Sequence, residues 1–325
     1  MRLNVTRAAV LAAALFGLSV LPSTRAQAQG WPQRAVKFIV PLGPGSGVDI
    51  GARLFADRLS ARWGRPVVVE NRPGGDSLVA IKAFVSANDD HTLLFGPSGA
   101  FTVHPFLYDK LPYAPADLQP IARVSNTIIA VGVPASMNVG TLAEFVARAR
   151  AEPGKLNAAV VPGITEFTFD YFTKTAGLNI AKVPYKDIVQ AATDLGEGRV
   201  HVMVSSYAIL KPHSEAGRVK TLVVTGRQRA PILPQVPTAI EAGYPALELE
   251  GLAGLFGPRD MPRELREKIG ADVVAVAADP VVSARLIGTA QIVNPGGPAE
   301  FGAAIGAQTA QVAAMAKALG IKPKQ

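Results

Sequence analysis

Short runs of branched aliphatic residues alternate along this chain with longer stretches in which apolar residues recur every three to four positions. The short runs predict buried strands, and the longer spacing predicts amphipathic helices. Strands are expected at Ala35–Val40, Pro66–Glu70, His91–Phe95, Ile128–Val133, Ala158–Val161, His201–Ser205 and Lys220–Thr225. Helices are expected near Val48–Trp63, Ser77–Ala87, Leu142–Ala151, Phe167–Ala176, Ile188–Glu197 and Ile209–Ala216, then from Arg263 onward, over Pro280–Ile287 and over Ala299–Leu319. This alternation is typical of an α/β protein with largely parallel sheets.

The arrangement of these elements also predicts how the chain is divided. The sequence holds no internal repeat, low-complexity tract or long flexible linker between its strands and helices. Two lobes joined by more than one crossing strand, with a cleft between them, fit this pattern.

The first 28 residues differ from the rest. Arg2 and Arg7 precede an apolar run over residues 8–21, and the small-x-small sequence Ala26-Gln27-Ala28 follows. This is the pattern of a secretory signal peptide with its cleavage site. A membrane anchor needs about twenty uninterrupted apolar residues, more than this run holds. We therefore predict a signal peptide over residues 1–28 and a mature chain outside the cytoplasm.

Composition narrows the classes of function. A chain of 325 residues, 49% hydrophobic and 18% charged, is long enough for two globular domains. The absence of cysteine excludes disulfides, thiolate metal sites and cysteine nucleophiles. The net charge of +8 falls to about +5 without the signal peptide. Because the basic residues are dispersed and aromatic residues are few, we expect a small anionic ligand and no nucleic acid partner.

One segment suggests where an anion would bind. "KFIVPLGPGSGVDIGARL", residues 37–54, runs from a strand through a glycine-rich turn into a helix. The first turn of a helix carries unpaired N–H groups and positive partial charge, which together favour an anion. Gly43-x-Gly45 and the later Glu70 would suit a dinucleotide, but Val48 stands where the third glycine belongs. A plain tight turn without a ligand is the other alternative.

Three further turns of similar composition end predicted strands. They are "ENRPGGDS" (70–77), "FGPSGAF" (95–101) and "VVPGITEF" (160–167). Ligands of open α/β sheets bind outside the carboxyl ends of the strands, so these turns are expected to converge on one crevice.

Longer motifs in a fixed order carry a family resemblance. These are "PLGPGSGVDIGARLFADRL", "GRPVVVENRPGGDS", "TLLFGPSGAFTVHPFLYDKLPYAPADLQPIARV", "PGKLNAAVVPG", "VPYKDIVQAATDLGEGRVHVMV", "GRVKTLVVTGRQRAPILPQVPTAIEAGYP" and "GLFGPRDMP". In this order they closely resemble the Bug family of extracytoplasmic solute-binding proteins, the receptors of tripartite tricarboxylate-type transport systems. The resemblance covers roughly residues 31–320.

The resemblance implies an α/β type II periplasmic-binding-protein fold with a ligand cleft between two lobes. We expect lobe 1 to hold residues 29–129 and 254–325, and lobe 2 to hold residues 130–253. It further implies a periplasmic, monomeric receptor that binds a small organic acid, uses no cofactor and delivers its ligand to transmembrane permease subunits.

Ligand-binding positions follow from the same resemblance. They lie in the turn of the first lobe, its two neighbouring turns, the second-lobe loop and the end of a second-lobe strand, and comprise Gly43, Ser46, Gly47, Asp49, Gly74, Gly75, Ser77, Ser98, Pro162, Gly163, Ile164, Thr165, Glu166, Phe167 and Ser205.

The chain departs from the family pattern at several of these positions. Ser46 stands where the family has a second glycine, the second-lobe loop is shorter and bulkier, and Ser205 replaces a common aspartate. Phe167 either lines a slot for an aromatic or long apolar acid or belongs to the core, whereas Phe169 and Phe172 are predicted core residues. Glu166 is expected to favour the start of its helix, the alternative being contact with a hydroxyl or amine of the ligand.

The sequence gives little support for a metal site or for catalysis by a nucleophile. The histidines His91, His104, His201 and His213 lack metal-ligand spacing, so no metal is predicted. "GPSGA" misses the nucleophile-elbow pattern because Ala100 occupies the place of the final glycine. We predict a receptor without catalytic residues; an exported enzyme acting on a carboxylate and a ligand-binding relay to a sensor kinase are the alternatives.

Overall fold

A computed structural model describes residues 30–323 of the chain. The chain divides into two compact units at Gln33, and only residues 30–33 of the first unit lie in the described part. The predicted signal peptide, residues 1–28, lies outside the described residues. Both sheets belong to the unit that begins at Arg34.

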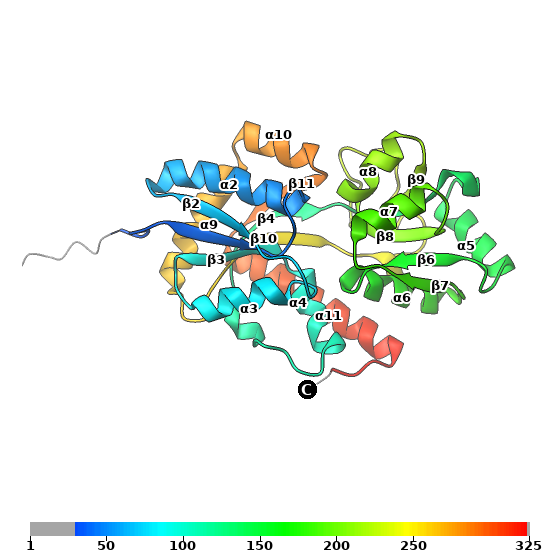
Figure 1. Cartoon of the computed structure of the whole chain (residues 1–325), viewed down its shortest axis with the longest axis horizontal. Helices are drawn as coiled ribbons and strands as arrows, with labels where there is room; N and C mark the ends of the chain where they lie inside the picture. The colour runs from blue at the N-terminus through cyan, green and yellow to red at the C-terminus, as the bar shows by residue number, and fades with distance from the viewer. Residues whose placement is uncertain (1–29, 324–325) are drawn as a thin grey trace, which may run out of the picture. The chain divides into compact units, whose positions relative to one another are not determined.

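The first sheet has the strand order β11-β4-β10-β3-β1-β2 (Figure 1). Its strands are β1 (Val36–Val40), β2 (Val67–Asn71), β3 (Thr92–Pro97), β4 (Gln119–Thr127), β10 (Gly251–Gly257) and β11 (Gln291–Gly296). The central strands β1, β3 and β10 are buried along nearly their whole length. Continuous apolar runs such as these are expected where helices cover both faces of a sheet.

The second sheet has the order β7-β6-β8-β5-β9. Its strands are β5 (Ile129–Pro134), β6 (Asn157–Val160), β7 (Ala181–Pro184), β8 (Val202–Ser206) and β9 (Val219–Val224). The chain enters this sheet between β4 and β5 at Ile128 and leaves it between β9 and β10, through residues 225–250. Two crossing segments therefore connect the sheets.

Strand directions correct the expectation of largely parallel sheets. β1 pairs in parallel with β2 and β3, and β6 with β7 and β8. The pairings of β10 with β3 and β4, of β4 with β11, and of β5 with β8 and β9 are antiparallel. A strand that crosses from one sheet enters the other at the edge where that sheet's parallel strands end, so β5 and β10 run against their neighbours. Both sheets are mixed.

Helices cover both faces of each sheet (Figure 1). On the first sheet, one face carries α2 (Gly47–Trp63), α9 (Arg263–Ala277) and α10 (Pro280–Gly288), and the other carries α3 (Leu78–Ala87), α4 (Gly99–Leu107) and α11 (Pro298–Leu319). On the second sheet, α5 (Leu142–Ala151) and α6 (Ile164–Ala176) lie opposite α7 (Ile188–Gly196) and α8 (Tyr207–Glu215). Short 3₁₀ turns occupy η1 (Pro115–Asp117), η2 (Ala135–Met137) and η3 (Pro245–Leu247).

Every expected strand and helix within the described residues is present, with its ends shifted by a few positions. The elements that the pattern missed are α4, β4, β7, β10 and β11. Pro105 lies inside α4, which obscures that helix in the sequence. Helix α6 begins at Ile164 and not at Phe167, so the second half of the expected second-lobe loop is the first turn of a helix.

Helices α4, α6 and α11 meet through an apolar cluster, called here the junction cluster, which joins the two sheets. Its members are Val103, Phe106, Phe167, Val312, Met315 and Ala316. The rings of Phe106 and Phe167 are 6.1 Å apart. The start of α6, which follows a strand of the second sheet, is thereby packed against helices of the first sheet.

No helix among residues 30–323 combines the length and the apolar character needed to cross a membrane.

Candidate functional site

The turn before α2 is held in shape by the start of its own helix. Ser46 is the N-cap residue, and its hydroxyl oxygen accepts a hydrogen bond from Asp49 N at 3.2 Å. The Asp49 carboxylate in turn accepts one from Gly45 N at 2.9 Å. Ser46 stands where the family has a second glycine, and its hydroxyl therefore acts as a helix cap.

Asp49 also connects the turn to its neighbours. The side chain is 3% exposed and accepts hydrogen bonds from Asn71 Nδ2 at 2.8 Å and Arg53 Nε at 3.2 Å. Burial alone would raise the pKa of Asp49, but the bonds from Gly45, Asn71 and Arg53 outweigh it and hold that pKa below its usual value. Because its oxygens are already bonded within the protein, Asp49 shapes the turn.

Gly47 marks a close approach between this turn and the edge strand β11. A Cβ atom at Gly47 would lie 2.9 Å from Gln291 Nε2. Gln291 Oε1 accepts hydrogen bonds from Ser125 Oγ at 3.0 Å and Thr127 Oγ1 at 3.1 Å. The first-lobe turn thus lies beside the end of β4, where the chain crosses to the second sheet.

The turn after β2 has an unusual backbone. Gly74, Gly75, Asp76 and Ser77 all have positive φ angles, of 118°, 55°, 49° and 72°. A non-glycine residue is strained in this region. Two of the four, Asp76 and Ser77, are not glycine. Asp76 is not among the ligand-binding residues predicted from the sequence.

His104 of α4 is hydrogen-bonded to the backbone of this turn. Its ring is fully buried, with Nε2 at 2.9 Å from the Asp76 carbonyl oxygen and Nδ1 at 2.7 Å from the Tyr113 hydroxyl. A carbonyl oxygen can only accept, so Nε2 carries a proton and donates a hydrogen bond to the Asp76 carbonyl oxygen. Burial and the nearby Asp76 carboxylate raise the pKa of Tyr113, which keeps the hydroxyl protonated.

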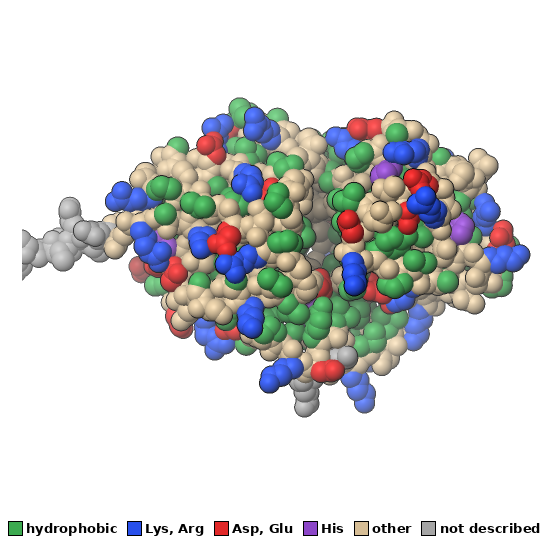
Figure 2. All heavy atoms as spheres, viewed as in Figure 1, with side chains coloured by type: hydrophobic (Ala, Val, Ile, Leu, Met, Phe, Trp, Pro, Cys, Tyr) green, Lys and Arg blue, Asp and Glu red, His purple; other side chains and the backbone are tan. Residues whose placement is uncertain are grey.

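Two of the first-lobe turns reach the start of α6. A Cβ atom on Gly163 would lie 3.2 Å from Asp76 Oδ1, and one on Gly99 would lie 2.7 Å from Ile164 Cγ2. The turn after β2 and the start of α4 therefore lie against the start of α6. Figure 2 shows a groove between the side of the molecule that carries α2 and α10 and the side that carries α7 and α8.

Ser98, after β3, is completely buried and donates a hydrogen bond from Oγ to Gln308 Oε1 at 2.7 Å. Its backbone N–H donates to Leu252 O at 2.9 Å. Ser98 is the N-cap residue of α4 but makes no side-chain cap bond. Its hydroxyl is engaged with the C-terminal helix.

Replacing Ser98 with alanine is expected to lower the free energy of unfolding by about 1–2 kcal/mol, because the buried Gln308 oxygen loses its main donor. Thr102 Oγ1, at 3.4 Å, compensates little. Urea unfolding of both proteins measures the difference. Thr309→Ala, which removes an exposed hydroxyl beside Gln308, should change stability by less than about 0.5 kcal/mol. Equal effects of the two variants would contradict this role of Ser98.

Of the predicted site residues in the second lobe, some line a small cavity and others are buried in the core. Thr165 and Glu166 line a small cavity with residues 158–161, Phe169 and Val204, next to Pro162 and Gly163. Phe167 and Phe172 are buried, Phe167 in the junction cluster. Of the two alternatives for Phe167, the structure therefore supports the core position. Phe169 and Phe172 are core residues as predicted.

Glu166 is paired within the second lobe. Lys182 Nζ lies 2.8 Å from Glu166 and 2.9 Å from Asp170. Burial opposes the charge on Lys182, but the two carboxylates prevail and raise its pKa. For Asp170, burial outweighs Lys182 and raises the pKa of the carboxyl group. Lys182 is therefore already paired with two carboxylates.

Ser205, near the end of β8, is 1% exposed, and its Oγ has no hydrogen-bond partner among the described residues. Ser205 pairs with Ala130 of the neighbouring strand β5. The adjacent Ser206 is the N-cap residue of α8.

A larger cavity, of about 660 Å³, lies elsewhere. It is lined by the crossing segments, β11 and α11, including Asn126, Arg227, Glu250 and Gln308, and by none of the predicted site residues. Gln308 connects it to Ser98, because its Nε2 donates to Glu250 O at 2.8 Å while its Oε1 accepts from Ser98. No short-range sequence signal could have found this cavity, since its walls come from segments far apart in the chain.

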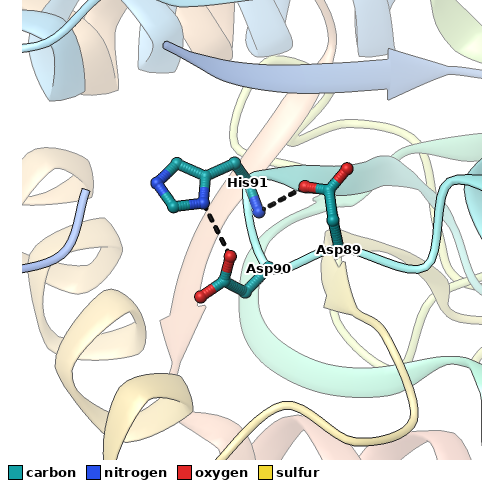
Figure 3. Close-up of side chains that lie close together, drawn as sticks. All are labelled: Asp89, Asp90 and His91. Carbon is teal, nitrogen blue, oxygen red and sulfur yellow. Dashed lines mark hydrogen bonds and ion pairs between the residues drawn. The ribbon is translucent and has the colours of Figure 1, made fainter. Parts of the chain in front are cut away.

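Asp89, Asp90 and His91 bring three potential metal ligands together before β3 (Figure 3). Asp89 accepts bonds from His91 N at 2.8 Å and Thr92 Oγ1 at 3.0 Å, and Asp90 lies 2.6 Å from His91 Nδ1. These bonds fix the turn that begins the strand. The group lies at the amino end of β3, whereas the candidate turns follow the carboxyl ends.

Two mixed sheets linked by crossing segments, with turns from both at one junction, define a protein of the periplasmic-binding-protein class. The chain belongs to the tripartite tricarboxylate transporter family of receptors, whose sequence model matches residues 51–293. The predicted resemblance to the Bug receptors is thereby confirmed.

Individual relatives agree with this assignment. A UPF0065 protein from the tcbD-tcbE intergenic region of Pseudomonas sp. strain P51 is 33% identical over 288 residues, 86% of this chain and 85% of that protein. The solved structure of R. palustris Rpa4515 with adipate has a TM-score of 0.82 and 30% identity, covering 90% of this chain and 100% of that one. MatC from Rhodopseudomonas palustris with bound malate has a TM-score of 0.76 and 25% identity, covering 88% and 99%.

Proposed function

We propose that this protein is a periplasmic receptor that captures a small organic acid between its two lobes and delivers it to transmembrane permease subunits. Lobe 1 would comprise residues 29–129 and 254–325, and lobe 2 residues 130–253. An N-terminal signal peptide over residues 1–28 would direct its export. Binding alone is required of the site, with no catalytic residue and no cofactor.

One observation supports this proposal above the others: helices from both sheets begin at the junction, and several begin without a side-chain cap. Among the described helices, α4, α6 and α8 have Ser98, Gly163 and Ser206 as N-cap residues, none with a side-chain cap bond. Uncapped helix starts keep N–H donors and positive partial charge for an anion. The adipate and malate bound by the two structural neighbours are small carboxylates of the kind that such donors suit.

The two-lobed arrangement gives the mechanism. Each lobe offers half of the donors, so an acid that touches both stabilises the closed arrangement by its higher affinity for that state. Closure around the ligand would present a surface made of both lobes to the permease.

Thermal unfolding of the chain from residue 29 onward, with a panel of di- and tricarboxylates, amino acids and aromatic acids, tests the proposal. Binding to the native state alone raises the melting temperature, and ligand at about 100 times its Kd adds roughly 2.7 kcal/mol. We expect a shift with one chemical class of acid and none with the corresponding amides. Stability unchanged by every acid would contradict the proposed receptor.

Gly163→Ala provides a matched variant for that measurement. Its new Cβ would lie 3.2 Å from Asp76 Oδ1, and the residue has φ of 136°, so the start of α6 must move. We expect this variant to lose the thermal shift. Gly177→Ala, at the other end of α6 with φ of 64° and open space around its Cβ position, should keep it.

A further inference from the structure

The Asp76 carboxylate differs from the other acidic groups around the candidate turns. Asp49 is paired with Arg53, and Glu166 and Asp170 are paired with Lys182. Within the part of the chain that the structure describes, neither lysine nor arginine lies within ion-pair distance of Asp76, whose contact is with His104 Nε2 at 3.2 Å. Asp76 therefore lacks the lysine or arginine partner that the other acidic groups around the candidate turns have.

This carboxylate is held in a fixed position. The backbone carbonyl of Asp76 is bonded to His104, whose ring is locked by Tyr113, and its Oδ2 is buried against the same ring without a hydrogen bond. The backbone of Asp76 and its buried Oδ2 are thus positioned before any ligand arrives, as an effective binding group requires.

The backbone at Asp76 gives an independent reason to assign it a role. Its φ of 49° lies within a run of four left-handed residues, a conformation that favours glycine. An aspartate is tolerated there at a cost, and such strain is concentrated at functional positions. A residue that served the turn alone would be better replaced by glycine.

The remaining carboxylate oxygen faces the second lobe. Oδ1 lies 3.2 Å from the Cβ position of Gly163, the uncapped start of α6. An organic acid whose carboxylate is bound by the helix start would have its neighbouring carbon beside Asp76. A second anionic group there would be repelled, whereas an ammonium or hydroxyl group could donate to Oδ1.

We propose that Asp76 selects the ligand: the site takes organic acids that carry an ammonium or hydroxyl group next to a carboxylate, in preference to plain dicarboxylates. This inference rests on the proposed function and narrows its substrate class. Because the ammonium or hydroxyl group donates a hydrogen bond to a charged carboxylate, the Kd of such an acid should be roughly tenfold or more below that of the plain dicarboxylate.

Titration calorimetry with chain-length-matched acids tests it. The sets are succinate, malate and aspartate; glutarate, 2-hydroxyglutarate and glutamate; and adipate with 2-aminoadipate. We expect the wild-type protein to bind the amino or hydroxy acid of one set at least about tenfold more tightly than its plain counterpart.

Variants at Asp76 separate its charge from its shape. Asp76→Gly, which also relieves the positive φ, should bring the preference to within about threefold, mainly by weakening the substituted acid. Asp76→Asn keeps an acceptor oxygen and tolerates this backbone, so it should keep a preference for the hydroxy acid and lose that for the amino acid. Asp57→Asn removes an exposed charge from α2 and should leave the ratios as in the wild type.

The possible results overturn either the inference alone or the inference together with the proposed function. Tighter binding of plain dicarboxylates by the wild type, or a ratio that Asp76→Gly leaves unchanged, overturns the inference while the receptor function stands. A gain of affinity for every acid alike in Asp76→Gly also overturns it, since Asp76 would then only repel ligands. Failure of all the acids to bind overturns the proposed function together with the inference.

Discussion

Replacing Asp49 with alanine is expected to lower the free energy of unfolding by about 2–3 kcal/mol and to remove ligand binding. The change deletes the acceptor for Gly45 N, Asn71 and Arg53, and leaves the Gly45 N–H and the Asn71 amide to find new partners. The turn before α2 would lose the bonds that fix its path. Urea unfolding and calorimetry with the acid identified by thermal shift measure the two effects.

Asp49→Asn tests the charge separately from the shape. The low pKa of Asp49 in the folded protein means that its stabilisation is present above about pH 4, the unfolded value, and is lost as the pH falls through the folded pKa. The wild type should therefore lose more stability than Asp49→Asn as the pH falls from about 5 to about 2, which urea unfolding at steps of about one pH unit measures. Parallel pH profiles would show that the carboxylate charge contributes nothing.

Replacing Gly254 with alanine is expected to destabilise the protein by about 3 kcal/mol or more. Gly254 lies in the middle of β10, where a Cβ atom would be 2.3 Å from the Ala122 carbonyl oxygen and 2.5 Å from the buried Phe301 ring. Strand β4 and helix α11 would both have to move, and overpacking of a close-packed core is costly. The midpoint of urea unfolding measures the loss.

The matched control for this variant is Gly306→Ala on α11. Gly306 is exposed, and its Cβ position has no atom within 4 Å. Alanine in an open helical position should raise stability by up to about 1 kcal/mol. If Gly254→Ala were as stable as the wild type, the close pairing of β10 with β4 would be wrong.

Local sequence patterns were sufficient to predict many of the helices, strands and turns. The turn after β1 and the helix that follows it are defined by neighbouring residues, since Ser46 and Asp49 cap and brace the same helix. The four turns could be placed at strand ends for the same reason. The family motifs then supplied the family and the fold class, which the comparisons confirm.

What the sequence missed depends on partners distant in the chain. β10 and β11 are recognisable only through their pairing with β4, and Gln308 gains meaning only beside Ser98, 210 residues away. Asp76 was overlooked because nothing nearby reveals its positive φ, its contact with His104 or its approach to Gly163. Its importance comes from three-dimensional surroundings that residue type alone does not encode.

The position of β4 has a consequence for how the chain becomes ordered. Its two neighbours in the first sheet are β10 and β11, which begin at Gly251 and Gln291, more than 120 residues after β4 itself ends at Thr127. Contacts between such distant segments close slowly, because the entropy of a long loop must be lost before any pairing is gained. The second sheet, whose strands all lie between residues 129 and 224, can assemble while the first is still incomplete. The first sheet can therefore be completed only when the last third of the polypeptide is available.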